Sequence, residues 1–287
     1  MHQRLIGVGP ARFRIVSDWE SPLRALDALY ADYPPVTDGY ADFTVRLEAA
    51  RPWRRFIRPS VHIRGDHMIA DALPLPLSMA LLAAEMGMNL QMALGWRRHV
   101  LLHAASVERD GRAVILSGTS GSGKSTLAAM LGEGDWRLMG DEFALVGLDT
   151  PDCIAFPRPV SLKNASIAAM TSRVDAARFG PLIAATPKGD IRHMVPRQDA
   201  IARMAAPARA ALIIFPLFGS AASIRPMLPA ETFVRLTDAS TNYVALGEAG
   251  FDALTRLAAD VPAFEITYPD GTAGQSLVRQ LFDETSA

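Results

Sequence analysis

Hydrophobic and polar positions follow one pattern in the first hundred residues and another in the rest of the chain. Between Phe13 and Ala70, short strand-like runs are separated by turn residues such as Pro34-Pro35, which is typical of strands joined by turns. The segment from Ser21 starts Ser-Pro and carries apolar residues at helical spacing, which predicts a helix. Residues 1–76 are therefore predicted to form a small α+β unit.

The stretch from Leu77 to Trp96 is a long apolar segment, interrupted only by Glu85, Asn89 and Gln91. Because it is apolar on nearly every side at helical spacing, it predicts a helix buried between layers. Its methionines are interpreted as core filler. Residues 77–99 are therefore predicted to be a buried connecting helix.

From Val100 onward the pattern becomes strand, glycine-rich loop, helix and strand. Two strand-like runs meet at Asp110-Gly111, which predicts a hairpin. The second run, Arg112–Ser117, leads directly into the loop, and the helical run after the loop ends in glycine. Because the C-terminal third again alternates strands and helices, residues 100–287 are predicted to form one α/β domain.

The glycine-rich loop, Gly118 to Thr126 (GTSGSGKST), matches the phosphate-binding pattern G-x-x-x-x-G-K-[ST] in full. Glycines let backbone N–H groups converge on phosphate oxygens, and the following helix adds free N–H groups and the positive end of its dipole. Lys124 is expected to reach the β- and γ-phosphates, and the Ser125 hydroxyl to ligate Mg²⁺. The residues expected to contact the nucleotide are Gly118, Ser120, Gly121, Ser122, Gly123, Lys124, Ser125 and Thr126.

An acidic pair, Asp141 and Glu142, follows the apolar strand-like run Trp136–Met139. Beside a bound triphosphate, two adjacent acids can have different roles: one can organise Mg²⁺, and the other can accept a proton from an incoming hydroxyl. The sequence leaves open which of the two would be the base. It also leaves open the alternative that both acids merely begin a loop.

Composition excludes several classes of protein. Hydrophobic residues make up 49% and charged residues 21%, as in ordinary globular proteins. The net charge of −1 gives no signature of nucleic-acid binding, and the single Cys153 excludes an internal disulfide framework or a cysteine-rich zinc site. No apolar run was expected to reach the roughly 18 residues of a membrane span, and no signal peptide is recognised. We therefore expect a cytoplasmic protein with neither a membrane nor a nucleic-acid partner.

One short segment, Arg51–Pro59 (RPWRRFIRP), departs from the even distribution of charge, with four arginines and two aromatic residues. It is too short to predict a nucleic-acid surface by itself, and the rest of the chain does not share its charge. Because edge strands commonly carry charge and proline, it is interpreted as a solvated strand edge.

The order of a histidine, a glycine-rich loop and an acidic pair over residues 100–146 resembles the core of the HPr serine kinase/phosphorylases. Two later stretches, Phe156–Asn164 and Thr186–Met194, make the chain look more like the HPr kinase-related proteins, whose relatives include lasso peptide kinases. The resemblance implies an α/β fold with a phosphoenolpyruvate-carboxykinase-like P-loop core and a mixed sheet. It also implies ATP and Mg²⁺ as cofactors, and a possible homo-oligomer.

Carried over to this chain, the resemblance implies that Asp141 and Glu142 are metal partner and catalytic base, and that His103 lies beside the nucleotide. A pKa near neutrality would let His103 supply positive charge there; its apolar neighbours are equally compatible with a core histidine. Glu142 stands where the family has Asp, and no clear match is found for the later glycine-rich segment associated with dephosphorylation. Kinase activity is therefore expected, and phosphorolysis is in doubt.

Three further cations are candidates for binding the substrate. Arg158 lies between two prolines, Lys163 follows it closely, and Lys188 stands beside a glycine. Loops that each hold one cation suit a transferring phosphoryl group, whose charge spreads over three oxygens. They could instead be surface residues, and His193 is assigned to a surface loop.

The leading hypothesis is an ATP- and Mg²⁺-dependent kinase that phosphorylates a hydroxyl, namely serine in a protein or peptide of unknown identity. One alternative is a kinase acting on a small molecule such as an amino acid or a sugar. Another is a nucleotide-binding regulator or assembly factor with little turnover. Dual kinase/phosphorylase activity on the sugar-transport carrier HPr is the remaining alternative.

Overall fold

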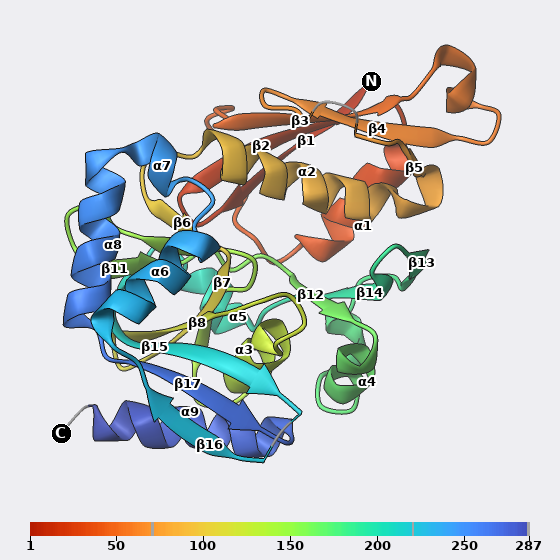
Figure 1. Cartoon of the computed structure of the whole chain (residues 1–287). Coiled ribbons are helices and arrows are strands. Elements are labelled where there is room, and N and C mark those ends of the chain that lie inside the picture. Colours follow the sequence, from red (N-terminus) through yellow and green to blue (C-terminus); the bar gives the residue numbers. More distant parts are fainter. Residues whose placement is uncertain (70–71, 220, 286–287) are drawn as a thin grey trace.

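The strand-rich first hundred residues and the loop-containing remainder form units of mixed α/β structure (Figure 1). The structure is a computed structural model that describes residues 1–69, 72–219 and 221–285. Residues 70–71, 220 and 286–287, which belong to the predicted units 1–76 and 100–287, lie outside these ranges.

A five-stranded sheet and two helices build the N-terminal unit. The elements are β1 (His2–Val8), β2 (Ala11–Ser17), α1 (Glu20–Leu29), β3 (Phe43–Ala49), β4 (Ser60–Gly65), β5 (Leu75–Pro76) and α2 (Ala80–Gly95). The strands are arranged in the sheet in sequence order. β2 and β3 are parallel because α1 returns the chain to the end of the sheet at which β2 began, and the other pairs are antiparallel. Phe13 and Ile15 of β2 are fully buried, and both helices pack on the same face of the sheet (Figure 1).

The predicted apolar helix is present as a short 3₁₀ turn, Leu77–Met79, followed by α2. It lies against β3 and β4 so closely that a Cβ on Gly87 would come within 2.5 Å of the Val45 side chain. The opposite face of the helix is only partly covered, since the Met86 side chain is 47% exposed and the Leu94 side chain is 39% exposed. The helix therefore belongs to the core of the N-terminal unit along one face, rather than being buried all round.

By length and composition alone, the 19-residue segment Leu77–Gly95 is able to cross a membrane, with a mean hydropathy of 1.2. The expectation that no apolar run is long enough was wrong on this point. In the folded protein 56% of the segment is buried, and core helices of globular proteins share this composition. No second helix among the described residues passes the same test.

The second unit is built on a nine-stranded mixed sheet. Its strands are β6 (Val100–Leu102), β7 (Ala104–Arg109), β8 (Arg112–Ser117), β9 (Arg137–Gly140), β10 (Ala144–Val146), β11 (Asp152–Ile154), β15 (Ala208–Phe218), β16 (Ser223–Pro226) and β17 (Ala263–Tyr268). At its centre β8, β15 and β17 run parallel, while β7 and β9 are antiparallel neighbours. The predicted hairpin joins β7 to β8, with Asp110 at φ 55° and Gly111 at φ 77°.

Helices cover both faces of this sheet (Figure 1). They are α3 (Lys124–Gly132), α5 (Gln198–Ala202), α6 (Pro229–Ala239), α7 (Tyr243–Leu246), α8 (Glu248–Asp260) and α9 (Gly271–Glu284). Val114 and Leu116 of β8 face the core under α3 and α9, whereas Ala113 and Ile115 face the core under α6 and α8. A strand that is buried on both faces has to be apolar at successive positions, which explains the continuous run of apolar residues in β8.

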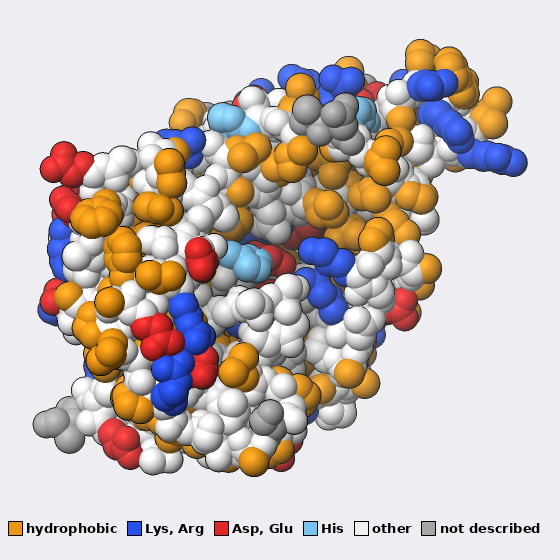
Figure 2. Space-filling model, viewed as in Figure 1, with side chains coloured by type: hydrophobic (Ala, Val, Ile, Leu, Met, Phe, Trp, Pro, Cys, Tyr) orange, Lys and Arg blue, Asp and Glu red, His pale blue; other side chains and the backbone are white. Residues whose placement is uncertain are grey.

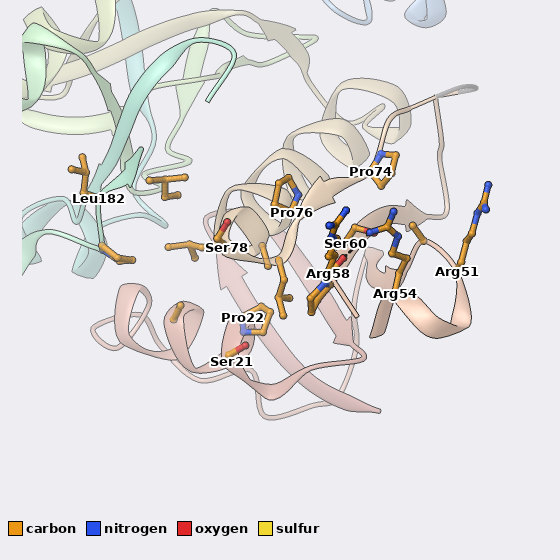
Figure 3. Close-up of a pocket in the computed structure, with 18 residues that line it drawn as sticks. Ser21, Pro22, Arg51, Arg54, Arg58, Ser60, Pro74, Pro76, Ser78 and Leu182 are labelled. Atoms are coloured by element: carbon orange, nitrogen blue, oxygen red, sulfur yellow. Dashed lines mark hydrogen bonds between the residues drawn. The ribbon is translucent and has the colours of Figure 1, made fainter. Parts of the chain in front are cut away.

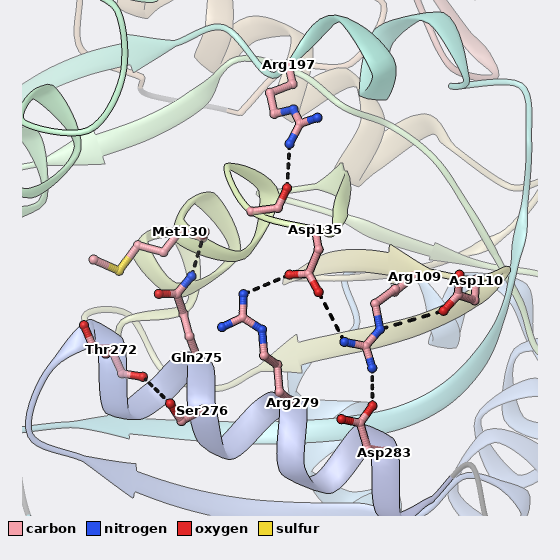
Figure 4. A network of polar contacts seen from close by, with 11 residues as sticks. Arg109, Asp110, Met130, Asp135, Arg197, Thr272, Gln275, Ser276, Arg279 and Asp283 are labelled. Atoms are coloured by element: carbon pink, nitrogen blue, oxygen red, sulfur yellow. Dashed lines mark hydrogen bonds and ion pairs between the residues drawn. The ribbon is translucent and has the colours of Figure 1, made fainter.

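Polar contacts fix the C-terminal helix α9 on the second unit (Figure 4). Arg109, at the end of β7, pairs with Asp135 at 3.3 Å and with Asp283 of α9. Arg279 of α9 binds the same Asp135 at 2.8 Å. The β7–β8 hairpin, the turn before β9 and the last helix are thereby held together at the end of β8 opposite the glycine-rich loop.

A three-stranded sheet lies at the side of the second unit (Figure 1). It comprises β12 (Val160–Lys163), β14 (Gly189–Met194) and β13 (Ile183–Thr186), with α4 (Ala165–Thr171) following β12. By contrast, the arginine-rich segment Arg51–Pro59 is not the strand edge that the sequence suggested. It forms a 3₁₀ helix, Pro52–Arg55, in the connection between β3 and β4, because the proline sits at the helix start and the following side chains stay in solvent.

Candidate functional site

The glycine-rich loop leaves the carboxyl end of β8, beside the carboxyl ends of the parallel strands β15 and β17. Gly121 and Gly123 have φ values of 85° and 97°, which L-residues with a side chain rarely adopt. A Cβ on Gly123 would also lie 2.5 Å from the Tyr268 hydroxyl. The loop thus needs glycine for its backbone path, and α3 begins directly after it at Lys124.

The Lys124 ammonium is folded into the loop. Its Nζ donates to the carbonyl oxygens of Gly118 at 2.6 Å and Thr119 at 2.9 Å, and the residue is only 7% exposed. Burial lowers the pKa of Lys124, whereas the nearby Asp141 and Glu142 carboxylates act in the opposite direction. The ammonium therefore stands between the loop and the acidic pair, where a phosphate chain bound by the loop would meet it.

Asp141 follows β9 directly and is 5% exposed. Its Oδ2 accepts a hydrogen bond from the Ser161 amide at 3.1 Å, while Oδ1 has no hydrogen-bond partner among the described residues. Burial, and then the Glu142 charge, raise the pKa of Asp141 to about 6, although the neighbouring Ser125 hydroxyl works against this shift. Asp141 and Ser125 are thus adjacent oxygen groups in the wall of one site.

Glu142 is more open than Asp141, with 29% of its side chain exposed. Its Oε2 lies 3.8 Å from Nδ1 of His103, whose side chain is 48% exposed. His103 lies between β6 and β7, and its backbone N–H donates a hydrogen bond to the Ala239 carbonyl at 2.7 Å. It is therefore neither a strand residue nor a core residue.

The charge expected on His103 is not favoured by its surroundings. Burial lowers the pKa of His103, Glu142 raises it, and Lys124 lowers it again, with a net decrease. Neutral imidazole consequently predominates at neutral pH. In this structure His103 is a polar neighbour of Glu142, and the positive charge suggested for it from the sequence stays a prediction.

These groups meet in a pocket of about 610 Å³. On the molecular surface it is a hollow in the middle of the face shown, where histidine, acidic and basic side chains gather (Figure 2). Lys163, at the end of β12, and Lys188, at the β13–β14 turn, line the opposite wall. Neither lysine makes an ion pair within the described part of the chain. The predicted residues that line the pocket are His103, Ser120, Gly121, Gly123, Lys124, Ser125, Thr126, Asp141, Glu142, Lys163 and Lys188.

Arg158 is not at this pocket, contrary to its assignment as a substrate-binding residue. It is 5% exposed and forms a buried ion pair with Glu85 of α2. Its Nη1 also binds Asn89, and the Tyr30 hydroxyl donates to Glu85 at 2.9 Å. The prolines beside Arg158 hold it in the boundary between the two units, where its charge is already neutralised.

His193 is likewise misplaced by the sequence interpretation, which assigned it to a surface loop. It lies on β14 opposite Ser161 and is 2% exposed. Burial lowers the pKa of His193, and its Nδ1 has no hydrogen-bond partner in the described structure.

Two aromatic residues of the pocket were missed. Phe218 ends β15 and Tyr268 ends β17, and their rings meet edge to face with centroids 5.7 Å apart. The signal that could have found them is positional, because ligands of open α/β sheets lie outside the carboxyl ends of the strands. Single-sequence reasoning could not establish that β15 pairs with β8 and that β17 pairs with β15.

The residues present fit a nucleotide with Mg²⁺. Ser122 Oγ in the loop and Asp141 Oδ1 beside it are buried atoms with no hydrogen-bond partner in the part of the chain that the structure describes, and the loop offers converging backbone N–H groups. No cluster of three or more His, Cys, Asp or Glu residues that could hold a metal occurs among the described residues. Mg²⁺ bound with phosphates needs only one or two carboxylates from the protein, so Ser125 and Asp141 are an adequate set.

Comparisons with protein-family models and with curated proteins find no match. Among solved structures, the chain is similar to the structure of the Hpr(Ser) kinase/phosphatase from Coxiella burnetii, with 13% sequence identity and a TM-score of 0.29. The match covers 65% of this chain and 99% of that chain. A likeness at this level assigns no activity, and the function below rests on the residues of the pocket.

Proposed function

We propose that this chain is an ATP- and Mg²⁺-dependent kinase that transfers the γ-phosphoryl group to a hydroxyl, namely serine in a protein or peptide. The observation that supports this most directly is the arrangement of Lys124, Ser125, Asp141 and Glu142 around one pocket. We also infer the phosphoenolpyruvate-carboxykinase-like form of the P-loop core, since antiparallel strands flank β8 and β15 in a mixed sheet. A cytoplasmic location stays a prediction.

The loop side of the pocket binds the donor. Backbone N–H groups of the loop and the first turn of α3 bind phosphate oxygens, and Lys124 leaves the two loop carbonyls to contact the terminal phosphates. Ser125 and Asp141 would hold Mg²⁺, which supplies charge neutralisation on the phosphates. Asp141 has to be ionised for this role, and a neighbouring cation restores ionisation to a carboxyl whose pKa is raised.

The opposite side of the pocket receives the acceptor. Glu142 is the more exposed acid and takes the proton of the acceptor hydroxyl. The hydroxyl oxygen forms a bond to the γ-phosphorus, the bond from that phosphorus to the bridging oxygen breaks, and ADP leaves with the electron pair. Lys163 and Lys188 face the charge that spreads over the transferring group.

The test is phosphoryl transfer from γ-labelled ATP to serine peptides and, in parallel, to amino acids and sugars. Glu142→Gln should lower transfer on the order of 10²- to 10⁴-fold, the usual contribution of a general base, while ATP binding measured by calorimetry persists. Asp149→Asn is the matched control, because Asp149 is an exposed carboxylate outside the pocket.

Retained transfer in the Asp141→Asn, Glu142→Gln double variant would overturn this mechanism. Transfer to metabolites but not to peptides would make the chain a small-molecule kinase. ATP binding without transfer to any acceptor, together with ATP-dependent association with a partner, would make it a regulator or assembly factor.

A further inference from the structure

A second cavity, of about 1140 Å³, opens on the N-terminal unit (Figure 3). It lies between the start of α1, the β3–β4 connection, the entry to α2 and the segment before β13. We call it the arginine groove; the residues that define it are Arg51, Arg54, Arg58, Pro22, Pro76 and Leu182. Arg54 and Arg58 lie together beside Ser60, and Leu182 stands at the opposite end (Figure 3).

Within the described part of the chain, the charge of the groove has one sign and is not neutralised. Arg51, Arg54 and Arg58 form no ion pair with any described residue. Arg54 donates only to the Arg58 carbonyl, at 3.2 Å, and the Arg51 guanidinium lies 5.3 Å from the Trp53 ring centroid. No described residue that lines the groove is acidic. An unpaired cationic lining of this kind is complementary to an anionic ligand.

The walls of the groove indicate the shape of that ligand. They are formed by prolines and short side chains, among them Pro22, Pro74 and Pro76, and Leu182 is 55% exposed. A concave, partly apolar channel accepts an extended chain, whereas a bilayer surface would touch projecting side chains such as Trp53, Phe56 and Ile57 and would not fill the channel. Three arginines would also form fewer phosphate contacts than specific nucleic-acid binding requires.

The groove is connected to the phosphate-binding pocket by one hairpin. Ile183, at the start of β13, lines the groove, and Lys188, at the β13–β14 turn, lines the pocket. A fully extended chain between these two residues spans at most about 17 Å. A polypeptide lying in the groove therefore reaches the pocket with roughly six further residues.

We propose that the arginine groove binds an acidic segment of the acceptor polypeptide, and so places a serine some residues away at Glu142. The inference rests on the proposed kinase function and adds to it the class of acceptor, a peptide with a run of Asp or Glu beside the modified serine. Arg51, Arg54 and Arg58 act as binding residues remote from the transferred group.

The experiment measures binding and transfer separately. A fluorescein-labelled peptide of about twelve residues, long enough to cover the groove and reach the pocket, carries one serine and a run of glutamates. Its affinity for the full chain is measured by fluorescence anisotropy without nucleotide. The same peptide with glutamine for glutamate is the ligand control. The protein variants are Arg51→Gln/Arg54→Gln/Arg58→Gln and a control with the same change of charge, Arg46→Gln/Arg173→Gln/Arg209→Gln, in which the replaced arginines are exposed and line neither cavity.

The expected result is at least a tenfold weaker binding of the acidic peptide to the groove variant, a small change in the control variant, and unchanged ATP binding by calorimetry. With the acidic peptide as acceptor, the groove variant should raise KM and leave kcat nearly unchanged, since the replaced residues do not contact the reacting atoms.

Equal binding of the acidic and glutamine peptides, or equal affinity of the wild type and the groove variant, would overturn the proposal whether or not the chain is a kinase. Charge-dependent binding without transfer would instead contradict the kinase function and leave the groove assignment standing. Vesicles rich in anionic lipid form a further arm: binding to vesicles that depends on the three arginines, without peptide binding, would also overturn the proposal.

Discussion

The pocket at the glycine-rich loop and the arginine groove are both lined by basic side chains, but the charges in the two cavities are arranged in opposite ways. In the pocket, Lys124 and Asp141 are nearly buried, charges of both signs converge, and pKa values are shifted. In the larger groove, Arg51 and Arg58 are exposed and carry one sign of charge with no opposing partner among the described residues. Charges that perturb one another are suited to chemistry, whereas an open surface of a single sign is suited to recognition.

The pocket lies within the second unit, whereas the groove is formed mostly by the N-terminal unit and is completed by residues before β13. The buried Glu85–Arg158 pair joins the two units. Arg158→Met leaves Glu85 charged and without its cation, and should lower the free energy of unfolding by about 3 to 5 kcal/mol, measured by urea denaturation. The double variant Glu85→Leu/Arg158→Met should lose much less, because no uncompensated charge remains. If Arg158 instead bound substrate, the single variant would keep its stability and lose activity.

A substitution at Lys124 tests whether the two cavities have separate roles. Lys124→Ala removes the cation that we propose to contact the terminal phosphates and should reduce transfer by about 10²- to 10³-fold, as the loss of one stabilising donor does. Binding of the acidic peptide should be unaffected, because Lys124 lies outside the groove. Steady-state transfer and peptide anisotropy on the same preparation check both statements. A loss of peptide binding in this variant would show that the cavities are not separate sites.

Asp141 should give the pocket a dependence on pH that the groove lacks. Burial and Glu142 raise the pKa of Asp141 from 3.8 to about 6, so the folded protein holds this proton more tightly than the unfolded chain. The resulting stabilisation is complete below pH 3.8 and is lost as the pH rises through about 6. In metal-free buffer, Asp141→Asn should therefore raise the free energy of unfolding by about 2 to 3 kcal/mol near neutral pH, and by little in acid.

Urea denaturation at an acidic and at a neutral pH measures this difference. The groove variant Arg51→Gln/Arg54→Gln/Arg58→Gln serves as the comparison. Its free energy of unfolding should change by a similar amount at both pH values, because arginine does not titrate between them. An equal effect of Asp141→Asn at both pH values would contradict the pKa shift.

Sequence patterns predicted the local parts of this protein well. The β7–β8 hairpin and the helices α1 and α3 are where the turn and periodic signals placed them. Two short segments were not predicted correctly: the strand β1 was missed, and Arg51–Pro59 was assigned to a strand edge. In a short segment of mixed polarity, the spacing of apolar residues does not distinguish a strand from a turn.

Long-range placement was beyond the reach of single-sequence reasoning. Arg158 and Lys163 looked alike as loop cations, yet Arg158 is paired with Glu85 of α2 and Lys163 lines the pocket. Whether a cation is neutralised depends on a residue far away in the chain, and no local pattern records that partner. The same reason explains why Phe218 and Tyr268 were missed and why His193 was assigned to the surface.

By itself, the sequence determined the conformation of the glycine-rich loop, since glycine spacing fixes backbone conformation over a few residues. It also determined the strand and helix that flank the loop, since periodicity fixes which faces are apolar. Only the tertiary structure decided that Asp141, Glu142, His103, Lys163 and Lys188 share one pocket. Only the structure, too, showed that three arginines of the β3–β4 connection line a groove near it. These arrangements depend on packing between distant elements, which is a property of the whole fold and not of any segment.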